Sequence, residues 1–181
     1  MKYPYEIRLS GSGGQGLILA GIILARAAVL ENHHVTQTQS YGPESRGGYS
    51  YADVIISNED IYFPEAVSFD CLLALNQESC DKYLFDLREN GILIVDTTFV
   101  KNIALVVENT YEVPFTEIAI EKLGSPIPTN IMALAFLVQV TGIVKLASLQ
   151  QAIEESVKPA FIDLNLRAMR LGVDLGKNYE K

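Results

Sequence analysis

The chain of 181 residues has no tryptophan, two cysteines and two histidines. Two cysteines, Cys71 and Cys80, cannot build a disulfide framework or supply the four thiolates of a typical iron–sulfur cluster. We therefore expect reduced thiols and a cytoplasmic protein. His33 and His34 are adjacent, whereas two metal ligands on one helix face stand four residues apart, so the sequence predicts no metal site.

Basic residues are scarce and scattered: 14 Lys and Arg stand against 22 Asp and Glu, a net charge of −8. Nucleic acids and anionic membranes bind clustered Lys and Arg, so neither is an expected partner. The longest apolar stretches, Leu17–Leu30 and Ile131–Val138, fall short of the ~20 residues that cross a bilayer. We expect no membrane span, and the segment Met1–Glu6 has no apolar core typical of a secretion signal.

The composition, 49% hydrophobic and 20% charged, is typical of a globular protein. Short apolar runs alternate with helical patterns, which predicts an α/β fold: a three-layer Rossmann-like sandwich with a mixed, mostly parallel sheet. We expect one domain, 1–181, with a C-terminal helical part at about 129–176. The predicted strands are Tyr5–Leu9, Val35–Gln39, Tyr49–Ser57, Cys71–Leu75, Ile92–Val95, Ala104–Val107 and Tyr111–Val113. The predicted helices are Leu17–Leu30, Glu78–Glu89 ended by Gly91, Ile131–Val140 with Asn130 as N-cap, Leu149–Ser156 and Ala160–Leu171.

A glycine-rich turn between the first strand and the first helix is the clearest local motif. It consists of Gly11, Ser12, Gly13, Gly14, Gln15 and Gly16. Glycines permit a tight turn, and the amides of a helix N-terminus favour an anion. A dinucleotide site also needs an acidic residue about 20 residues on, where the sequence has Thr38-Gln39-Ser40, and a P-loop needs Lys and Ser/Thr, where it has Leu17-Ile18. The turn is a candidate for binding a phosphate-bearing group, for recognising another protein's backbone, or for a tight turn without ligand.

A second segment combines an aromatic residue, an acid, a base and three glycines. Its candidate residues are Ser40, Tyr41, Gly42, Pro43, Glu44, Arg46, Gly47 and Gly48. Turn-forming residues predict a loop. Glu44 and Arg46 can pair within it, or Arg46 can bind a carboxylate or phosphate. If this loop follows a strand parallel to the first one, it lies at the same edge of the sheet as the glycine turn.

Together the two motifs resemble a known family, the gamma subunits of 2-oxoacid:ferredoxin (or flavodoxin) oxidoreductases, also found as a domain of pyruvate:ferredoxin oxidoreductase. The resemblance is clearest over residues 7–97, and the stretch Thr38–Glu44 is most similar to the 2-oxoglutarate branch. The matching segments are Leu9–Gly16, Ala20-Gly21, Gln37–Gly48, Val54–Ser57, Ile61–Pro64, Asp70–Gln77 and Gly91–Asp96.

The resemblance implies a subunit of an enzyme complex. Such a complex decarboxylates a 2-oxoacid on thiamine diphosphate and magnesium, passes electrons through iron–sulfur clusters to ferredoxin or flavodoxin, and transfers the acyl group to coenzyme A. The thiamine diphosphate and the clusters belong to the other subunits, alpha, beta and a ferredoxin-like delta. This chain is then an accessory, assembly or coenzyme A-proximal part with no catalytic residue of its own. Its glycine turn suits a coenzyme A phosphate.

Two other interpretations remain open. In the first, the chain is a stand-alone dinucleotide-binding oxidoreductase with a degenerate fingerprint. In the second, it is an interaction module that binds no small molecule. Two helices that are apolar on nearly every face either leave surface for partners or for a homodimer, or pack fully within the monomer. Asp96, at a strand end, is either catalytic or a cap for the next segment.

Overall fold

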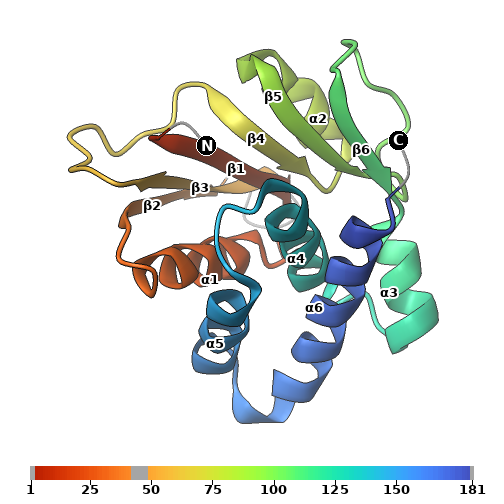
Figure 1. Cartoon of the computed structure of the whole chain (residues 1–181). Helices are drawn as coiled ribbons and strands as arrows, with labels where there is room; N and C mark the ends of the chain where they lie inside the picture. The colour runs from red at the N-terminus through yellow and green to blue at the C-terminus, as the bar shows by residue number, and fades with distance from the viewer. Residues whose placement is uncertain (1–2, 42–48, 180–181) are drawn as a thin grey trace.

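The computed structural model describes residues 3–41 and 49–179. These residues form a six-stranded sheet with helices on both faces (Figure 1). The strands are Tyr5–Ser12 (β1), His34–Tyr41 (β2), Tyr49–Ser57 (β3), Phe69–Ala74 (β4), Leu87–Asp96 (β5) and Asn109–Val113 (β6). The helices are Leu17–Val29 (α1), Gln77–Tyr83 (α2), Phe115–Leu123 (α3), Thr129–Thr141 (α4), Leu146–Ser156 (α5) and Ile162–Lys177 (α6), with short 3₁₀ segments at Leu84–Asp86 and Pro159–Phe161.

The strand order is β2-β3-β1-β4-β5-β6, and β3 runs antiparallel to both of its neighbours. The remaining pairs, from β1 to β6, are parallel. The expected mixed, mostly parallel sheet is confirmed. Since β3 reverses direction between them, β1 and β2 point the same way, and both end at the same edge of the sheet.

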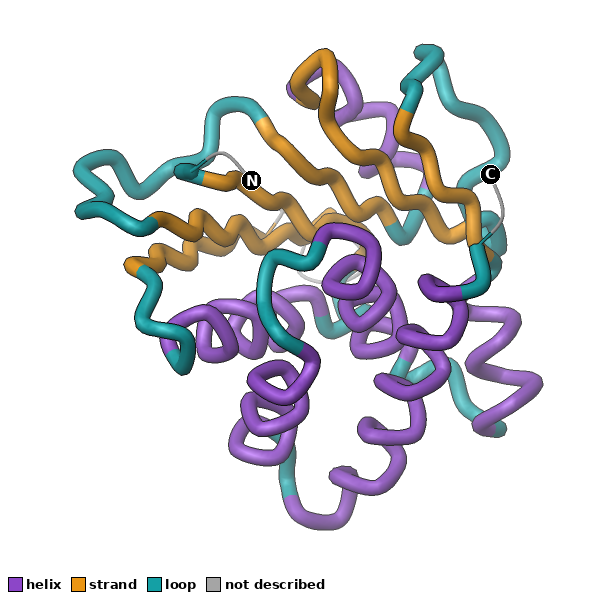
Figure 2. The backbone as a smooth tube through the Cα atoms, viewed as in Figure 1, coloured by secondary structure: helices purple, strands orange, loops and turns teal. Residues whose placement is uncertain are grey.

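One face of the sheet carries five helices, α1 and α3 to α6 (Figures 1 and 2). Ile7 and Leu9 of β1 and Leu73 of β4 point into this layer, where they join a large apolar cluster. Every residue of α4 from Ile131 to Val138 is buried, because α4 lies among α1, α3, α5 and α6. A helix without a polar face must be enclosed on all sides. The interpretation that this helix leaves apolar surface for partners is therefore wrong.

The opposite face carries α2 and the long loop between β3 and β4, over a second, smaller apolar cluster. Arg8 and Asp53 lie on this face and form a buried two-pronged ion pair, with N···O distances of 2.7 and 2.6 Å. The rings of Tyr51, Phe69 and Tyr83 cover the guanidinium at 4.0 to 4.5 Å. An arginine that is both paired and stacked on aromatic rings tolerates burial.

Two predicted elements are wrong. The helix predicted over Glu78–Glu89 ends at Tyr83, and Gly91 lies inside β5, because pairing of Leu87 with Phe69 starts the next strand early. Ala104–Val107 is a loop in which Val106 is fully exposed, so no neighbouring strand covers it. Helix α3, Phe115–Leu123, is absent from the predicted elements. The other helices and strands match the predicted order, with mostly longer strands. In the described residues, no helix combines the length and apolarity needed to cross a membrane.

Candidate functional site

The glycine turn begins inside the sheet. Gly11 and Ser12 are the last residues of β1, rather than part of the loop, and Gly16 precedes the first turn of α1. Gln15 closes the turn: its backbone N–H donates to the Ser12 carbonyl at 3.1 Å, and its side-chain oxygen accepts from the Ser12 N–H at 2.6 Å. Gly13 and Gly14 remain exposed at the tip. The turn is thus a fixed structure with an open outer side.

Two of its glycines are required by close packing. A Cβ on Gly11 would lie 2.3 Å from the side-chain oxygen of Gln15. Gly16 has φ 73°, a left-handed conformation that favours glycine, and a Cβ there would lie 2.5 Å from the Asn130 amide nitrogen. The turn geometry explains Gly11 and Gly16 without a ligand, and it also explains Gly14, whose φ of 94° favours glycine. Neither packing nor a positive φ accounts for the exposed Gly13.

Asn130 connects the turn to α4. Its side-chain N–H donates to the Gly16 carbonyl at 2.9 Å, although 114 residues separate them in sequence. Asn130 lies in the first turn of α4, where Pro128 precedes the helix, so its predicted role as N-cap is wrong. Its amide instead bonds a carbonyl at the start of α1. The N-termini of α1 and α4 therefore converge at the carboxyl edge of β1.

The N-termini of α1 and α4 favour an anion, although α2 beside them has Glu78 in its first turn. Among the described residues, the first turns of α1 and α4 carry no acidic side chain, and α1 has no side-chain cap. Both helices therefore direct the positive ends of their dipoles here. The N–H groups in the first turn of α1 have no partner within the helix, whereas the Thr129 N–H of α4 donates to the Pro126 carbonyl at 3.2 Å. Beside them, Asn76 donates to the Ser12 hydroxyl at 2.6 Å and caps α2 through Ser79 at 2.9 Å. The arrangement is suited to a phosphate or carboxylate.

Only the start of the second predicted segment falls within the described residues. Ser40 and Tyr41 belong to β2, not to a loop, because β2 pairs with β3 up to Tyr41 opposite Ser50. Ser40 lies opposite Tyr51, which in turn lies opposite Ser10 of β1. The end of β2 thus lies at the same edge as the glycine turn, as expected. The rest of the segment lies outside the described residues: Gly42, Pro43, Glu44, Arg46, Gly47 and Gly48. The ion pair between Glu44 and Arg46 stays a prediction.

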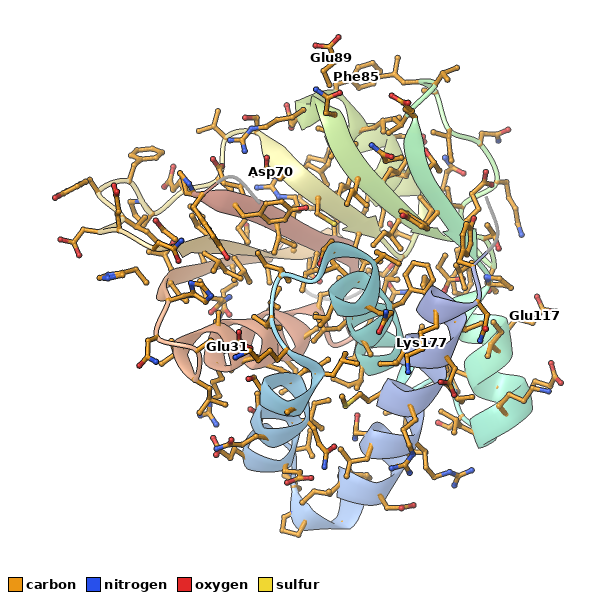
Figure 3. The ribbon with its side chains drawn as sticks, viewed as in Figure 1. Glu31, Asp70, Phe85, Glu89, Glu117 and Lys177 are labelled. Carbon is orange, nitrogen blue, oxygen red and sulfur yellow. The ribbon has the colours of Figure 1, made fainter. Side chains whose placement is uncertain are left out.

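The geometry differs from a dinucleotide site. In that fold the first helix returns the chain to a parallel strand beside the first. Here β3 lies between β1 and β2 and runs antiparallel to both. Glu31 lies on the turn after α1 and accepts the Lys145 backbone N–H at 2.6 Å (Figure 3). Its carboxylate supports the α4–α5 connection rather than a ribose.

Comparison with known proteins identifies the fold's relatives. The family model described as pyruvate ferredoxin/flavodoxin oxidoreductase matches residues 6–175. The chain belongs to this family. 2-Oxoglutarate synthase subunit KorC of Methanocaldococcus jannaschii is 45% identical over 180 residues, which cover 98% of this chain and 96% of that protein.

Solved structures of this family agree with the fold. The gamma subunit of keto/oxoacid ferredoxin oxidoreductase from Geobacter sulfurreducens is 41% identical, with a TM-score of 0.89 and 98% of each chain covered. The 2-oxoglutarate:ferredoxin oxidoreductase of Magnetococcus marinus has a TM-score of 0.87 over 32% of its chain. At 23% identity, that second likeness shows the fold alone.

The family's redox chemistry raises the question of whether this chain can hold a cluster. Cys71 points into the helical layer, and Cys80 packs in the cluster on the opposite face of the sheet. Burial raises the pKa of the Cys80 thiol to about 11 and that of Cys71 further, which disfavours the thiolate that iron requires. The two thiols therefore do not fit one cluster. Within the described chain, no group of three His, Cys, Asp or Glu residues is placed to hold a metal ion.

Asp96 is a structural cap. One of its carboxylate oxygens accepts from the Thr98 N–H at 3.0 Å, and the other accepts the Thr116 N–H and hydroxyl at 3.1 and 2.6 Å. The side chain is fully buried at the start of α3. Of the two interpretations of Asp96, the cap is the one that the structure supports.

Proposed function

We propose that this chain is the gamma subunit of a multi-subunit 2-oxoacid:ferredoxin oxidoreductase, and that the 2-oxoacid is 2-oxoglutarate. The observation that carries the proposal is the 45% identity to a 2-oxoglutarate synthase subunit over nearly the full length of both chains. The complex converts 2-oxoglutarate and coenzyme A to succinyl-coenzyme A and CO2 and reduces a low-potential acceptor. The two free, buried cysteines are compatible with a cytoplasmic location.

The proposed division of labour is the one that the family resemblance implies, and the residues of this chain are compatible with it. Alpha, beta and ferredoxin-like delta subunits are the proposed partners, and they would hold thiamine diphosphate, magnesium and the iron–sulfur clusters. Cys71 and Cys80 lie on opposite faces of the sheet and do not fit a cluster. We propose for this chain a non-catalytic role in assembly and near coenzyme A, as one domain with its C-terminal helices, α4 to α6, in the helical layer.

The residues Gly11–Gly16 are the proposed contact for coenzyme A, through one of its phosphates. Three features support this: the exposed tip at Gly13 and Gly14, the converging N-termini of α1 and α4, and first turns free of acidic side chains in the described structure. Backbone N–H groups at helix N-termini bind phosphate without help from a cationic side chain. In this role the chain binds and orients coenzyme A, and it moves no proton or electron.

Reconstitution tests the proposed function. The other subunits are produced with and without this chain, and reduction of ferredoxin or a low-potential dye is followed with 2-oxoglutarate, pyruvate and 2-oxoisovalerate. We expect a complex containing this chain, with coenzyme A-dependent activity highest on 2-oxoglutarate. A chain that fails to join the complex, or a complex that prefers another 2-oxoacid, would contradict the respective part of the proposal.

Two variants at one position test the coenzyme A contact. Gly13→Asp adds a negative charge at the tip, and Gly13→Asn adds a side chain of the same shape without charge. If a phosphate faces the turn, Asp raises the Michaelis constant for coenzyme A at least about tenfold, an energy of roughly 1.4 kcal/mol, while Asn raises it much less. Equal Michaelis constants for both variants and the wild-type complex would exclude the contact.

A further inference from the structure

The loop between β3 and β4, residues 58–68, exposes large apolar side chains far from the glycine turn. Tyr62 is 92% exposed, Phe63 61% and Val67 72%. The loop extends outward from the sheet in Figures 1 and 2. Isolated exposed apolar residues are ordinary on a surface, but three within six residues are typical of an interaction surface.

Internal contacts hold this loop in position. The Asn58 side-chain oxygen lies 2.9 Å from the His33 ring nitrogen, and the Thr36 hydroxyl donates to the Pro64 carbonyl at 3.5 Å. Ala66 is buried in the smaller apolar cluster, and Ile61 packs against it. The loop is thus anchored at both ends and at its centre, so Tyr62 and Phe63 are presented outward by a fixed backbone.

A groove of about 450 Å³ runs beside these side chains. Its apolar wall includes Tyr3, Ile55, Ile61, Tyr62, Phe63 and Val67, and its acidic residues are Glu6, Glu59, Asp60 and Glu65. Within the described residues, no lysine or arginine lines it. The groove therefore combines an apolar wall with negative charge.

The negative charge is largely uncompensated. Glu6 pairs with Arg88 at 2.5 Å, and Arg88 also pairs with Asp70. Asp60 faces His34 at 3.2 Å, and the Glu59 and Glu65 carboxylates form no ion pair with any described residue. Glu89 adds a further acid at the same amino-terminal edge of the sheet, beside the paired Asp70 (Figure 3). A partner that pairs with this surface must carry positive charge around an apolar centre.

We propose that the β3–β4 loop and its groove form the surface on which another subunit of the same complex docks, through an apolar patch bordered by lysine and arginine. This inference rests on the proposed function, since it takes the partner from the oxidoreductase complex. Aromatic residues are enriched at the centres of protein interfaces and contribute much of their affinity. Glu59 and Glu65 provide charge complementarity at its border.

This surface and the glycine turn lie at opposite ends of β1. The groove reaches Glu6 near the start of the strand, and the turn follows Ser12 at its end. The seven steps from Tyr5 to Ser12 span about 23 Å. A subunit docked on the β3–β4 loop therefore leaves the glycine turn accessible to its own ligand.

Two double variants test the docking surface in the complex assembled from co-produced subunits. Tyr62→Ser with Phe63→Ser removes the apolar centre, and Glu59→Lys with Glu65→Lys reverses the border charge. The matched controls are Val106→Ser with Phe161→Ser and Glu121→Lys with Glu154→Lys, at exposed positions away from the loop. Far-ultraviolet circular dichroism and thermal melting verify that each variant is folded. The dissociation constant between each variant of this chain and the remaining subunits is measured at 50 and 300 mM salt.

We expect the aromatic variant to weaken assembly at least about hundredfold, as for the loss of two interface anchors. The charge variant weakens it about tenfold at low salt and much less at high salt, because salt screens the interaction. Both controls keep the wild-type dissociation constant. Loop variants that assemble like the wild type would overturn the docking surface, as would variants that change only self-association of this chain. A wild-type chain that does not assemble at all would instead reject the proposed function.

Discussion

Replacing Gly172 by alanine tests how closely α6 packs against α4, the helix that carries Asn130 to the glycine turn. A Cβ on Gly172 would lie 2.1 Å from the Met132 carbonyl oxygen and 3.0 Å from the Ala135 Cβ. Close C–H···O contacts have C···O distances of about 3.3 Å or more, so the helices would have to separate by about 1 Å. Since α4 is buried on all sides, it cannot move without opening gaps elsewhere.

The magnitude follows from two opposing effects. Overpacking a core costs about 1–3 kcal/mol, and an obstacle made of backbone places this case at the upper end. The higher helix propensity of alanine relative to glycine stabilises the folded state by about 1 kcal/mol. We expect a net loss of about 2 kcal/mol in the free energy of unfolding. For a chain of this length that corresponds to a fall of about 4–8 °C in melting temperature.

Gly176, one turn further along α6, provides the matched control. A Cβ there meets the Gln139 Cγ at 2.8 Å and the Gln139 Cβ at 3.0 Å, in a half-buried side chain rather than at a backbone carbonyl, so a smaller shift relieves the contact. The helix propensity gain then offsets most of the cost, and Gly176→Ala stays within about 1 kcal/mol of the wild type. Urea unfolding followed by circular dichroism at 222 nm measures both variants. Equal losses in the two variants, or no loss in Gly172→Ala, would refute the packing argument.

Three further predictions concern buried polar groups. Asp53→Ala leaves the Arg8 guanidinium buried without its partner and lowers the free energy of unfolding by about 3–5 kcal/mol, whereas Arg8→Met with Asp53→Leu restores much of it in the same urea assay. Burial raises the pKa of Cys80 from 9.0 to about 11, so its contribution to stability is full below pH 9 and is lost as pH rises toward 11, by up to about 3 kcal/mol. Between pH 8 and 11, urea unfolding must therefore bring the free energies of unfolding of the wild type and Cys80→Ala closer together by about 2 kcal/mol, because the folded thiol is half ionised at pH 11. Asn130→Ala removes the hydrogen bond to Gly16, costs about 1 kcal/mol of stability, and raises the Michaelis constant of the complex for coenzyme A more than it lowers kcat.

Local patterns predicted much of the fold. The continuous apolar run of β4 and the apolar sides of α1 and α4 follow from burial on both faces, which leaves a mark in any short window of sequence. No local pattern predicts the boundary between α2 and β5. The helical pattern continues to Glu89, but the pairing of Leu87 with Phe69 decides the structure. The position of β3 between β1 and β2 also depends on pairing between distant segments, which no local pattern encodes.

The candidate site divides in the same way. The turn Gly11–Gly16 is recognisable from its glycines between a strand and a helix. The role of Asn130 is not recognisable from the sequence, because its partner lies 114 residues away and its amide hydrogen bond leaves no local pattern. The ion pair of Arg8 and Asp53 has an equally weak signal: polar residues that alternate in a strand indicate a solvent-facing side, yet aromatic rings cover this pair.

The two ends of β1 differ in charge. Two helices begin beside its carboxyl end, α1 directly after β1 and α4 after α3, and their described first turns carry no acid. The opposite edge collects Glu6, Glu59, Glu65 and their neighbours. About 23 Å separates the two ends of β1, nearly three Debye lengths of about 8 Å at physiological salt. Charge changes at one end therefore have little direct electrostatic effect at the other: Glu59→Lys should leave coenzyme A binding unchanged, and Gly13→Asp should leave assembly unchanged. Coupling between the two would mean that the ends communicate through the packed helices.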